Sequence, residues 1–319
     1  MTATAVRETI RPPAPAAPVR RRSRRTRLEL TLLLGPALLL FAGFVLVPIG
    51  VAGFYSLYRW NGFGPLSDFV GFDNYTDAFA GPVFQRAVGH NLIIAGLSIV
   101  VQLPLSIGLA MLLNRKLRGR AVLRSLVFAP YVLSEAITAV IWLLILQPGG
   151  FADQVLKAVG LGGLVQQWLA DPGIVLYTLF AVITWKYVGF GVVLLLAGLQ
   201  GVPAELREAA ALDGASAWQT ARHVVLPLLG PTIRIWIFLS VIGSLQLFDL
   251  VWIMTLGGPA NASTTMATYL VDHGFKRYEF GFGSAVAVIL FVFCFVFALL
   301  YQRFALRRDT EGALTRMVG

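Results

Sequence analysis

Three ionisable side chains lie within long apolar segments of this 319-residue chain: Glu135, Lys186 and Asp249. A charged group is costly in hydrocarbon, so such residues usually line the path of a solute or an ion. Polar or amphipathic side chains accompany them: Asn91, Gln102, Trp185, Gln246 and Trp252. Hydroxyl-binding groups beside an aromatic face suit a sugar-like ligand. The predicted substrate path consists of six of these residues: Asn91, Glu135, Trp185, Lys186, Gln246 and Asp249.

Another interpretation of these charges stays open. Glu135 and Lys186 could neutralise each other inside the membrane, and Asp249 could lie in water near its outer boundary. In that case the three residues would have a structural role and would bind no solute.

The sequence contains no constellation typical of an enzyme. His90, His223 and His273 are scattered and suit interfaces or loops, and Cys294 is the only cysteine, so neither a metal cluster nor an internal disulfide is expected. The phosphate-binding pattern GxxxxGK[ST] does not occur in the chain. We therefore expect no catalytic residue, no metal and no bound cofactor, and any ATP with its Mg²⁺ must be used by a partner protein.

The composition assigns the chain to the membrane class. It is 57% hydrophobic and 13% charged, with a mean hydropathy of +0.75, whereas soluble domains carry about a quarter charged residues. A bilayer-spanning helix needs about 20 apolar residues. Six segments qualify: Leu30–Leu57, Asn91–Leu113, Ala121–Leu146, Ile174–Leu199, Ile233–Met254 and Phe282–Tyr301. We expect Pro48, Pro104 and Pro130 to kink their helices.

Basic residues indicate the orientation. The net charge is +10, and 20 of the 26 Lys and Arg residues fall on one side of the expected membrane, together with both termini. The positive-inside rule makes that side cytoplasmic. Residues 1–27 form a disordered Arg-rich tail, which could contact anionic lipid or only enforce topology, and the run after it is a retained first span. Charge at the ends of apolar runs argues against nucleic-acid binding.

One polar segment interrupts the apolar pattern on the cytoplasmic side. The stretch EAAALDGASAWQTARHVVLP, residues 208–227, predicts a helix that stops at Gly214 and a second helix opened by a capping box between Ser216 and Gln219. The three alanines after Glu208 make a low-profile face that could enter a groove on another protein. The alternative is a surface helix that merely connects two spans.

The spacing in this stretch resembles the EAA signature of ABC-importer permeases of the carbohydrate type, related to the maltose and glycerol-3-phosphate systems. Three residues separate EAA from Gly214, and nine more separate that glycine from Val224, where the family more often has Ile. The segments FVGFDNYTDAF, RSLVFAP and TLGGPANAST extend the similarity over residues 30–303. The coupling residues that this resemblance implies are Glu208, Ala209, Ala210, Gly214, Leu226 and Pro227. Leu206 and Leu212 would pack against the ATPase or the membrane body.

The resemblance implies an all-α integral membrane protein with six transmembrane helices, cytoplasmic termini and a type I (MetI-like) permease core. The expected organisation is a tail (1–27), a first span with its outer loop (28–85), a permease core (86–303) with a coupling loop (201–227), and a tail (304–319). The implied partners are a second, different permease, two cytoplasmic ATPases, an extracytoplasmic solute-binding protein and the lipid of a bacterial cytoplasmic membrane.

Two other functions compete with an importer permease that moves a sugar-like solute. An ion-coupled secondary transporter would need inverted-repeat halves and a chain of buried acids, and three scattered ionisable groups do not supply them. An anchoring or sensor subunit without transport is the third possibility.

Overall fold

The computed structural model describes residues 24–115 and 118–306, so most of the predicted Arg-rich tail and C-terminal tail lies outside the described residues. The described ranges are helical and contain no strand beyond an isolated antiparallel bridge between Tyr58 and Phe69. The chain divides into two compact units, residues 1–51 and 52–319, and each is described by itself.

The first unit is a long apolar helix. It comprises α1 (Arg24–Phe41), the π-turn η1 (Ala42–Leu46) and the start of α2 (Val47–Tyr55), which continues into the second unit. Residues Thr31–Tyr55 have a mean hydropathy of 2.5, high enough to cross a membrane. This segment matches the first expected span.

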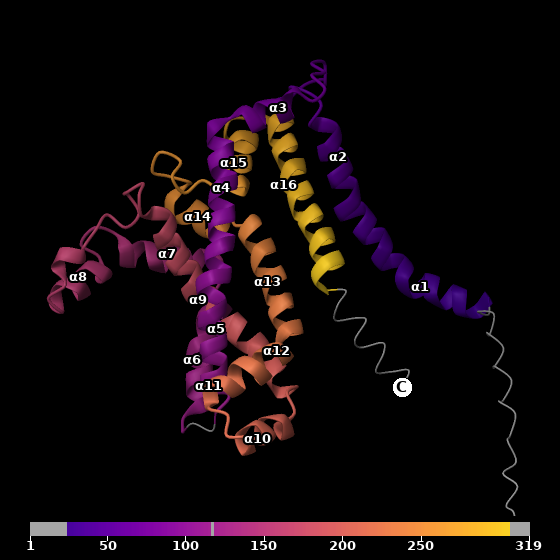
Figure 1. The fold of residues 1–319 in the computed structure, drawn as a ribbon. Coiled ribbons are helices and arrows are strands. Elements are labelled where there is room, and N and C mark those ends of the chain that lie inside the picture. Colours follow the sequence, from indigo (N-terminus) through magenta and orange to yellow (C-terminus); the bar gives the residue numbers. More distant parts are fainter. Residues whose placement is uncertain (1–23, 116–117, 307–319) are drawn as a thin grey trace, which may run out of the picture. The chain divides into compact units, whose positions relative to one another are not determined.

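Long helices run the length of the second unit (Figure 1). The first of them joins α4 (Pro82–Leu97), the π-turn η2 (Ser98–Gln102) and α5 (Leu103–Leu113) into one apolar segment, which begins nine residues before the expected Asn91. Two others confirm expected spans: α9 (Val175–Gln200) and α16 (Phe280–Tyr301), which continues into η6 (Gln302–Leu306).

Two expected spans are broken. The segment Ala121–Leu146 is not one helix, because α6 (Arg120–Val132) meets α7 (Glu135–Leu146) at 99°. The segment Ile233–Met254 ends its first helix, α13 (Gly230–Leu245), well before Met254, and α14 (Asp249–Thr255) follows after a gap. Four described helices are long and apolar enough to cross a membrane, or up to six if two bent pairs each count as one span: α6 with α7, and residues 217–228 with α13.

Prolines explain three of the five π-turns in the described residues. A proline has no N–H, and its ring clashes with the carbonyl four residues earlier. The turns η1, η2 and η4 (Ala221–Val225) end two residues before Pro48, Pro104 and Pro227. The extra residue in each π-turn accommodates the missing hydrogen bond.

Short helices complete the second unit. They are α3 (Asp73–Ala80), α8 (Phe151–Ala158), η3 (Gly162–Leu164), α10 (Ala204–Leu212), α11 (Ala217–Thr220), α12 (Leu226–Leu228), α15 (Met266–Val271) and η5 (Asp272–Lys276). The carboxylate of Asp153, in α8, accepts hydrogen bonds from the Trp168 indole at 2.9 Å and from the Gly149 amide at 2.8 Å, and both bonds lower its pKa. These two bonds tie Gly149, before α8, and Trp168, after it, to the first turn of the helix.

The core is built around α9. In the most apolar stretch of α9, 56% is buried, a larger share than in the other three helices that are long enough to span a membrane. The half around Leu179 packs with α7 and α14, and the half around Leu195 packs with α5 and α13. Small residues let its neighbours approach: Gly191 lies against Ser106 and Trp236, and Gly198 against Leu229. Such close contacts at small residues are typical of packed membrane helices.

Replacing Gly189 by Ala tests this packing. A Cβ built there overlaps the Val127 carbonyl oxygen of α6 and lies 3.0 Å from Phe128 Cα. Overpacking of this kind costs about 1–3 kcal/mol. We expect the melting temperature of the detergent-purified protein to fall by roughly 2–10 °C.

The matched control is Gly96→Ala in α4, where nothing lies within 4 Å of the added Cβ. Because Ala favours a helix over Gly by about 1 kcal/mol, this change should leave the melting temperature unchanged or raise it. Equal decreases for the two variants would contradict the close α6–α9 contact.

Candidate functional site

A cavity of about 410 Å³ lies where the two broken spans face α9 and η2. Its walls come from the end of α6, the start of α7, one face of α13 and residues 246–249. This volume is within the usual range of about 300–1,000 Å³ for small-molecule sites. The cavity is the candidate solute site.

The first break lies at Leu133 and Ser134, which have extended backbones with ψ of 142° and 154°. The Ser134 hydroxyl accepts from the Ile137 amide at 3.3 Å and so caps α7. Lys186 of α9 is 3% exposed, and its ammonium donates to the Leu133 carbonyl at 2.5 Å. The lysine thus satisfies a carbonyl that the bend removes from the helix.

Glu135, the first residue of α7, faces the cavity. It accepts a hydrogen bond from the Tyr187 hydroxyl of α9, the residue next to Lys186. The corner between α6 and α7 is therefore held from α9 at two adjacent positions. Lys186 reaches the Leu133 carbonyl and not the Glu135 carboxylate, so the two charges form no direct ion pair.

The second break follows Leu245 and is held by side chains from elsewhere in the unit. The Asn91 amide of α4 donates to the carbonyls of Ser244 at 2.6 Å and Leu245 at 3.3 Å, and its oxygen accepts from the Met266 amide at 2.9 Å. The Thr265 hydroxyl donates to the Leu247 carbonyl at 2.8 Å. Asn91, fully buried, joins three segments of the chain.

Polar groups at this break face the cavity. Gln246 and Asp249 line it, and both are exposed. Gln102 of η2 also lines it, is 3% exposed, and its side-chain nitrogen has no hydrogen-bond partner. An unpaired buried amide costs roughly 1–3 kcal/mol, which a bound acceptor would recover.

Aromatic rings form part of the wall. Tyr131 stacks on Phe190 at 5.0 Å between ring centroids, and Tyr187 packs edge-on against Tyr131. Trp236 and Phe248 lie on the α13 and α14 side. Flat apolar rings next to carboxylates and amides form a surface on which a saccharide ring can stack while its hydroxyls are bound.

The structure separates the six predicted path residues into three groups. Glu135, Gln246 and Asp249 line one cavity. Asn91 and Lys186 lie behind its wall with their polar heads bonded to backbone. Trp185 lies outside it, edge-on to Trp142 at 5.4 Å. The sequence-based prediction missed the aromatic wall of Tyr131, Tyr187 and Trp236, because aromatic residues in apolar segments give no distinguishing signal.

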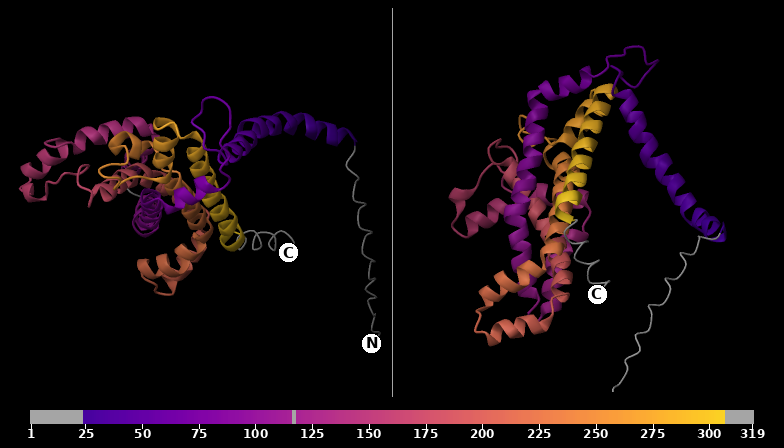
Figure 2. Two further views of the ribbon diagram at one scale, coloured as in Figure 1. Left: turned by 90° about the horizontal axis from the view of Figure 1, so that it is seen from above. Right: turned by 45° about the vertical axis from the view of Figure 1, so that its right-hand side comes forward.

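The predicted polar segment folds as an exposed helical hairpin at the end of the unit where α5 ends (Figure 2). In α10, Glu208 and Ala209 are exposed, and Gly214 with φ +79° ends the helix as its Ala215 neighbour donates to the Ala210 carbonyl at 2.9 Å. The predicted capping box is confirmed, with both Ser216–Gln219 hydrogen bonds present.

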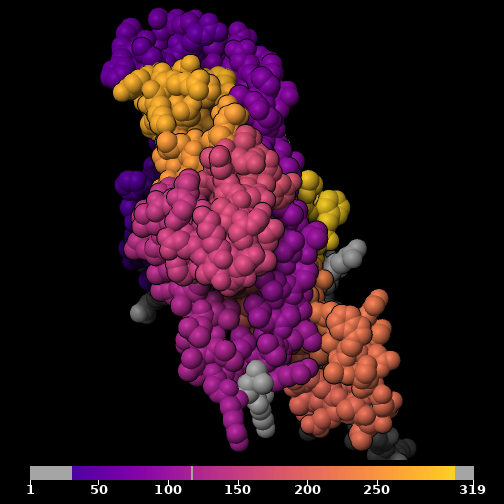
Figure 3. Space-filling model, turned by 90° about the vertical axis from the view of Figure 1, so that its left-hand side faces the viewer, coloured from indigo at the N-terminus to yellow at the C-terminus, as the bar shows by residue number. Residues whose placement is uncertain are grey.

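The hairpin presents apolar side chains to its surroundings. Leu212 is 89% exposed, Trp218 69% and Leu206 45%. The space-filling view shows residues 201–228 as a projection from the body of the unit (Figure 3). The helical segment ends at Leu228, one residue after Pro227, and a bend of 69° leads into α13.

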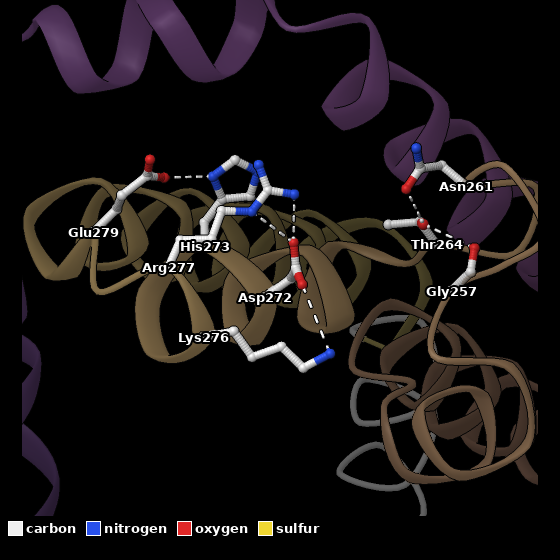
Figure 4. A network of polar contacts seen from close by, with 8 residues as sticks. All are labelled: Gly257, Asn261, Thr264, Asp272, His273, Lys276, Arg277 and Glu279. Carbon is white, nitrogen blue, oxygen red and sulfur yellow. Dashed lines mark hydrogen bonds and ion pairs between the residues drawn. The ribbon is translucent and has the colours of Figure 1, made fainter.

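A polar network fastens the opposite end of the unit (Figure 4). Arg277 forms an ion pair with Asp272 at 2.7 Å, and Glu279 contacts His273 at 2.6 Å. These contacts order the turn between η5 and α16 beside a groove of about 790 Å³. Within the described ranges, no group of three or more His, Cys, Asp or Glu side chains is placed to hold a metal ion.

Comparisons with known proteins bear on both sites. Residues 102–310 match the family model described as binding-protein-dependent transport system inner membrane component. The diacetylchitobiose uptake system permease protein NgcF of Streptomyces coelicolor is 34% identical over 319 residues, covering 95% of this chain and 90% of the relative. The trehalose/maltose transport system permease protein MalF of Thermococcus litoralis is 30% identical, covering 87% and 94%.

A solved structure has the same fold. A chain of a bacterial alginate ABC transporter, in complex with an alginate pentasaccharide-bound periplasmic protein, aligns with a TM-score of 0.78 at 24% identity. The alignment covers 90% of this chain and 96% of the other. The helical architecture of this chain is therefore shared with that transporter chain.

The corner contacts predict a specific energetic coupling. In a double-mutant cycle, Glu135→Gln and Tyr187→Phe should be non-additive by about 0.5–3 kcal/mol in unfolding free energy, because they share one hydrogen bond. Unfolding in mixed micelles, followed by circular dichroism, measures the cycle.

The matched cycle pairs Glu135→Gln with Lys186→Met. Its coupling energy should be smaller, since Lys186 donates to Leu133 and not to the carboxylate. A larger coupling for the lysine than for the tyrosine would show that the two charges, and not the Tyr187 hydroxyl, hold the corner.

Proposed function

We propose that this chain, which belongs to the family of binding-protein-dependent transport system inner membrane components, is the membrane-spanning permease subunit of an ATP-binding-cassette importer for a sugar or sugar-like solute. The observation that carries the proposal is the cavity between the broken spans, where carboxylates and amides meet aromatic faces. Broken helices around a central site are typical of transporters.

In this proposal the solute passes through the cavity. The carboxylates of Glu135 and Asp249 accept hydrogen bonds from hydroxyls, the amides of Gln246 and Gln102 donate to oxygens, and Tyr131 offers a flat face. The curated relatives named for diacetylchitobiose, trehalose/maltose and multiple sugars support a saccharide as the transported solute.

The hairpin of α10 and α11 couples the cavity to ATP hydrolysis in partner subunits. Its exposed Leu212 and Trp218 would be buried in a groove of the ATPase, and the alanines beside Glu208 permit close backbone approach. Glu208, Ala209, Ala210 and Gly214 form the docking helix and its turn. Leu226 and Pro227 lead to the 69° bend that connects it to the cavity wall. The chain itself binds no nucleotide and no cofactor.

The proposed topology counts α6 with α7 as one span and assigns another to α13, which with the four long helices gives six. Both termini and the hairpin are then cytoplasmic, with the Arg-rich residues 1–27 and the tail 304–319 on that side and the core at 86–303. The groove beside the network of Asp272 and Arg277 faces outward, toward a solute-binding protein. A second permease completes the pathway, two ATPases supply energy, and the complex lies in a bacterial cytoplasmic membrane.

Reconstitution tests the function. The chain with its partner permease, ATPases and binding protein in proteoliposomes should accumulate a labelled oligosaccharide only when ATP and Mg²⁺ are present. Uptake driven by a proton gradient through this chain alone would instead support an ion-coupled secondary transporter. The family membership and the exposed hairpin do not favour that alternative.

Substitutions at Gly214 provide a graded test of coupling. The residue has a left-handed φ of +79°, and no atom lies within 4 Å of an added Cβ. A substitution there therefore acts through the backbone conformation and not through a steric clash. Asn tolerates this region better than Ala, and Pro is excluded from it. We expect transport to decrease in the order Gly, Asn, Ala, Pro.

Charge reversal by Glu208→Arg should reduce ATPase co-purification, while Glu205→Gln one turn earlier serves as the control. If the proline and arginine variants retain both ATPase binding and solute-stimulated ATP hydrolysis, the hairpin is not the docking element.

A further inference from the structure

We infer that the cavity is a charge filter, which accepts neutral or cationic saccharides and rejects anionic ones such as uronic-acid sugars. This inference rests on the proposed function and specifies its substrate class. The groups that set the charge are the carboxylates of Glu135 and Asp249.

The cavity wall has one sign of charge. Two carboxylates line it, and no Lys, Arg or His is among the described residues that do. Lys186 lies behind the wall, where it donates to the Leu133 carbonyl and interacts with Glu135 only through space. The other lining residues are neutral. A bound anionic sugar would therefore face two like charges, with no cation on the wall itself to pair with.

The position of Glu135 strengthens the filter. Half-helix N-termini inside membrane transporters commonly bind the anionic group of a solute. Here the first turn of α7 already holds the chain's own carboxylate, which Tyr187 orients. The place that a solute anion would otherwise occupy is filled by a fixed negative charge.

Gln102 independently indicates a ligand in the same cavity. Its side-chain nitrogen is buried and has no partner, although it lines a space large enough for a sugar ring. An amide N–H donates to a neutral oxygen, such as a hydroxyl or an acetamido carbonyl. Together with the carboxylates, which accept from hydroxyl, N–H or ammonium groups, it matches neutral and amino sugars.

A thiol assay measures the charge of the cavity without any sugar. Cys294 is the only cysteine, so Cys294→Ser gives a thiol-free background, and Ser240→Cys then places one thiol on the cavity wall. In the assembled transporter, the rates of modification by a cationic and an anionic methanethiosulfonate are compared. We expect the cationic-to-anionic rate ratio to fall roughly tenfold when Glu135→Gln and Asp249→Asn are combined, equivalent to about 1.4 kcal/mol.

The controls separate charge from structure. Gln166→Cys in the exposed 161–174 loop should keep its ratio in the same double variant, because it does not line the cavity. Asp249→Asn alone should give part of the decrease in the rate ratio, because it removes one of the two carboxylates on the wall. The Asp249 side chain has no hydrogen-bond partner among the described residues, so this change leaves the corner of α6 and α7 intact. An unchanged ratio at Ser240→Cys would overturn the inference.

Transport distinguishes the inference from the function on which it rests. Proteoliposomes are supplied from outside with matched labelled disaccharides: neutral diacetylchitobiose, its de-N-acetylated cationic form and an anionic cellobiouronate. The double variant should gain anionic uptake relative to neutral uptake, whereas Asp171→Asn, distant from the cavity wall, should not. If the native complex imports none of the three with ATP but the thiol ratio responds, the importer function fails and the filter stands. If the native complex prefers the anionic sugar, the filter is wrong.

Discussion

A broken helix in a bilayer must find new partners for its freed backbone groups, because lipid offers none. The described structure meets this constraint twice. At the corner of α6 and α7, the Lys186 ammonium donates a hydrogen bond to the Leu133 carbonyl. At the end of α13, the Asn91 amide donates to the carbonyls of Ser244 and Leu245. The cavity exists because these bonds allow two spans to bend around it.

The same constraint divides the polar residues by role. Asn91 is fully buried and Lys186 nearly so, and each donates to backbone carbonyls. Glu135 and Asp249 follow the breaks and carry their carboxylates toward the cavity. The polar residues that hydrogen-bond to freed backbone carbonyls thus lie behind the cavity wall, whereas Glu135 and Asp249 line the cavity itself. Composition alone cannot distinguish them, because both kinds appear as isolated polar residues in apolar runs.

The sequence predicts the straight spans well and the bent ones poorly. Hydropathy identifies α9 and α16 because their apolar runs coincide with single helices. It does not detect the 99° bend at Leu133, since the segment remains apolar on both sides of it. Local chemistry carries the missing signal: Ser134 followed by Glu135 is a helix start, with a capping hydroxyl and an acid in the first turn. The aromatic wall depends on how distant helices face one another, which no local pattern encodes.

The helix α13 physically links the two sites. It begins at the bend beside Leu229, which is buried against Gly198 of α9. It ends where the Asn91 amide of α4 donates to the carbonyls of Ser244 and Leu245. Between these ends it is an uninterrupted α-helix whose Trp236 and Ser240 line the cavity. In the proposed coupling, a displacement of the hairpin would reach the cavity wall through this helix, which is held at both ends. The helix ends at Leu245, and the break before Asp249 separates it from α14, so the cavity lies at the point where the continuous helix from the hairpin side stops.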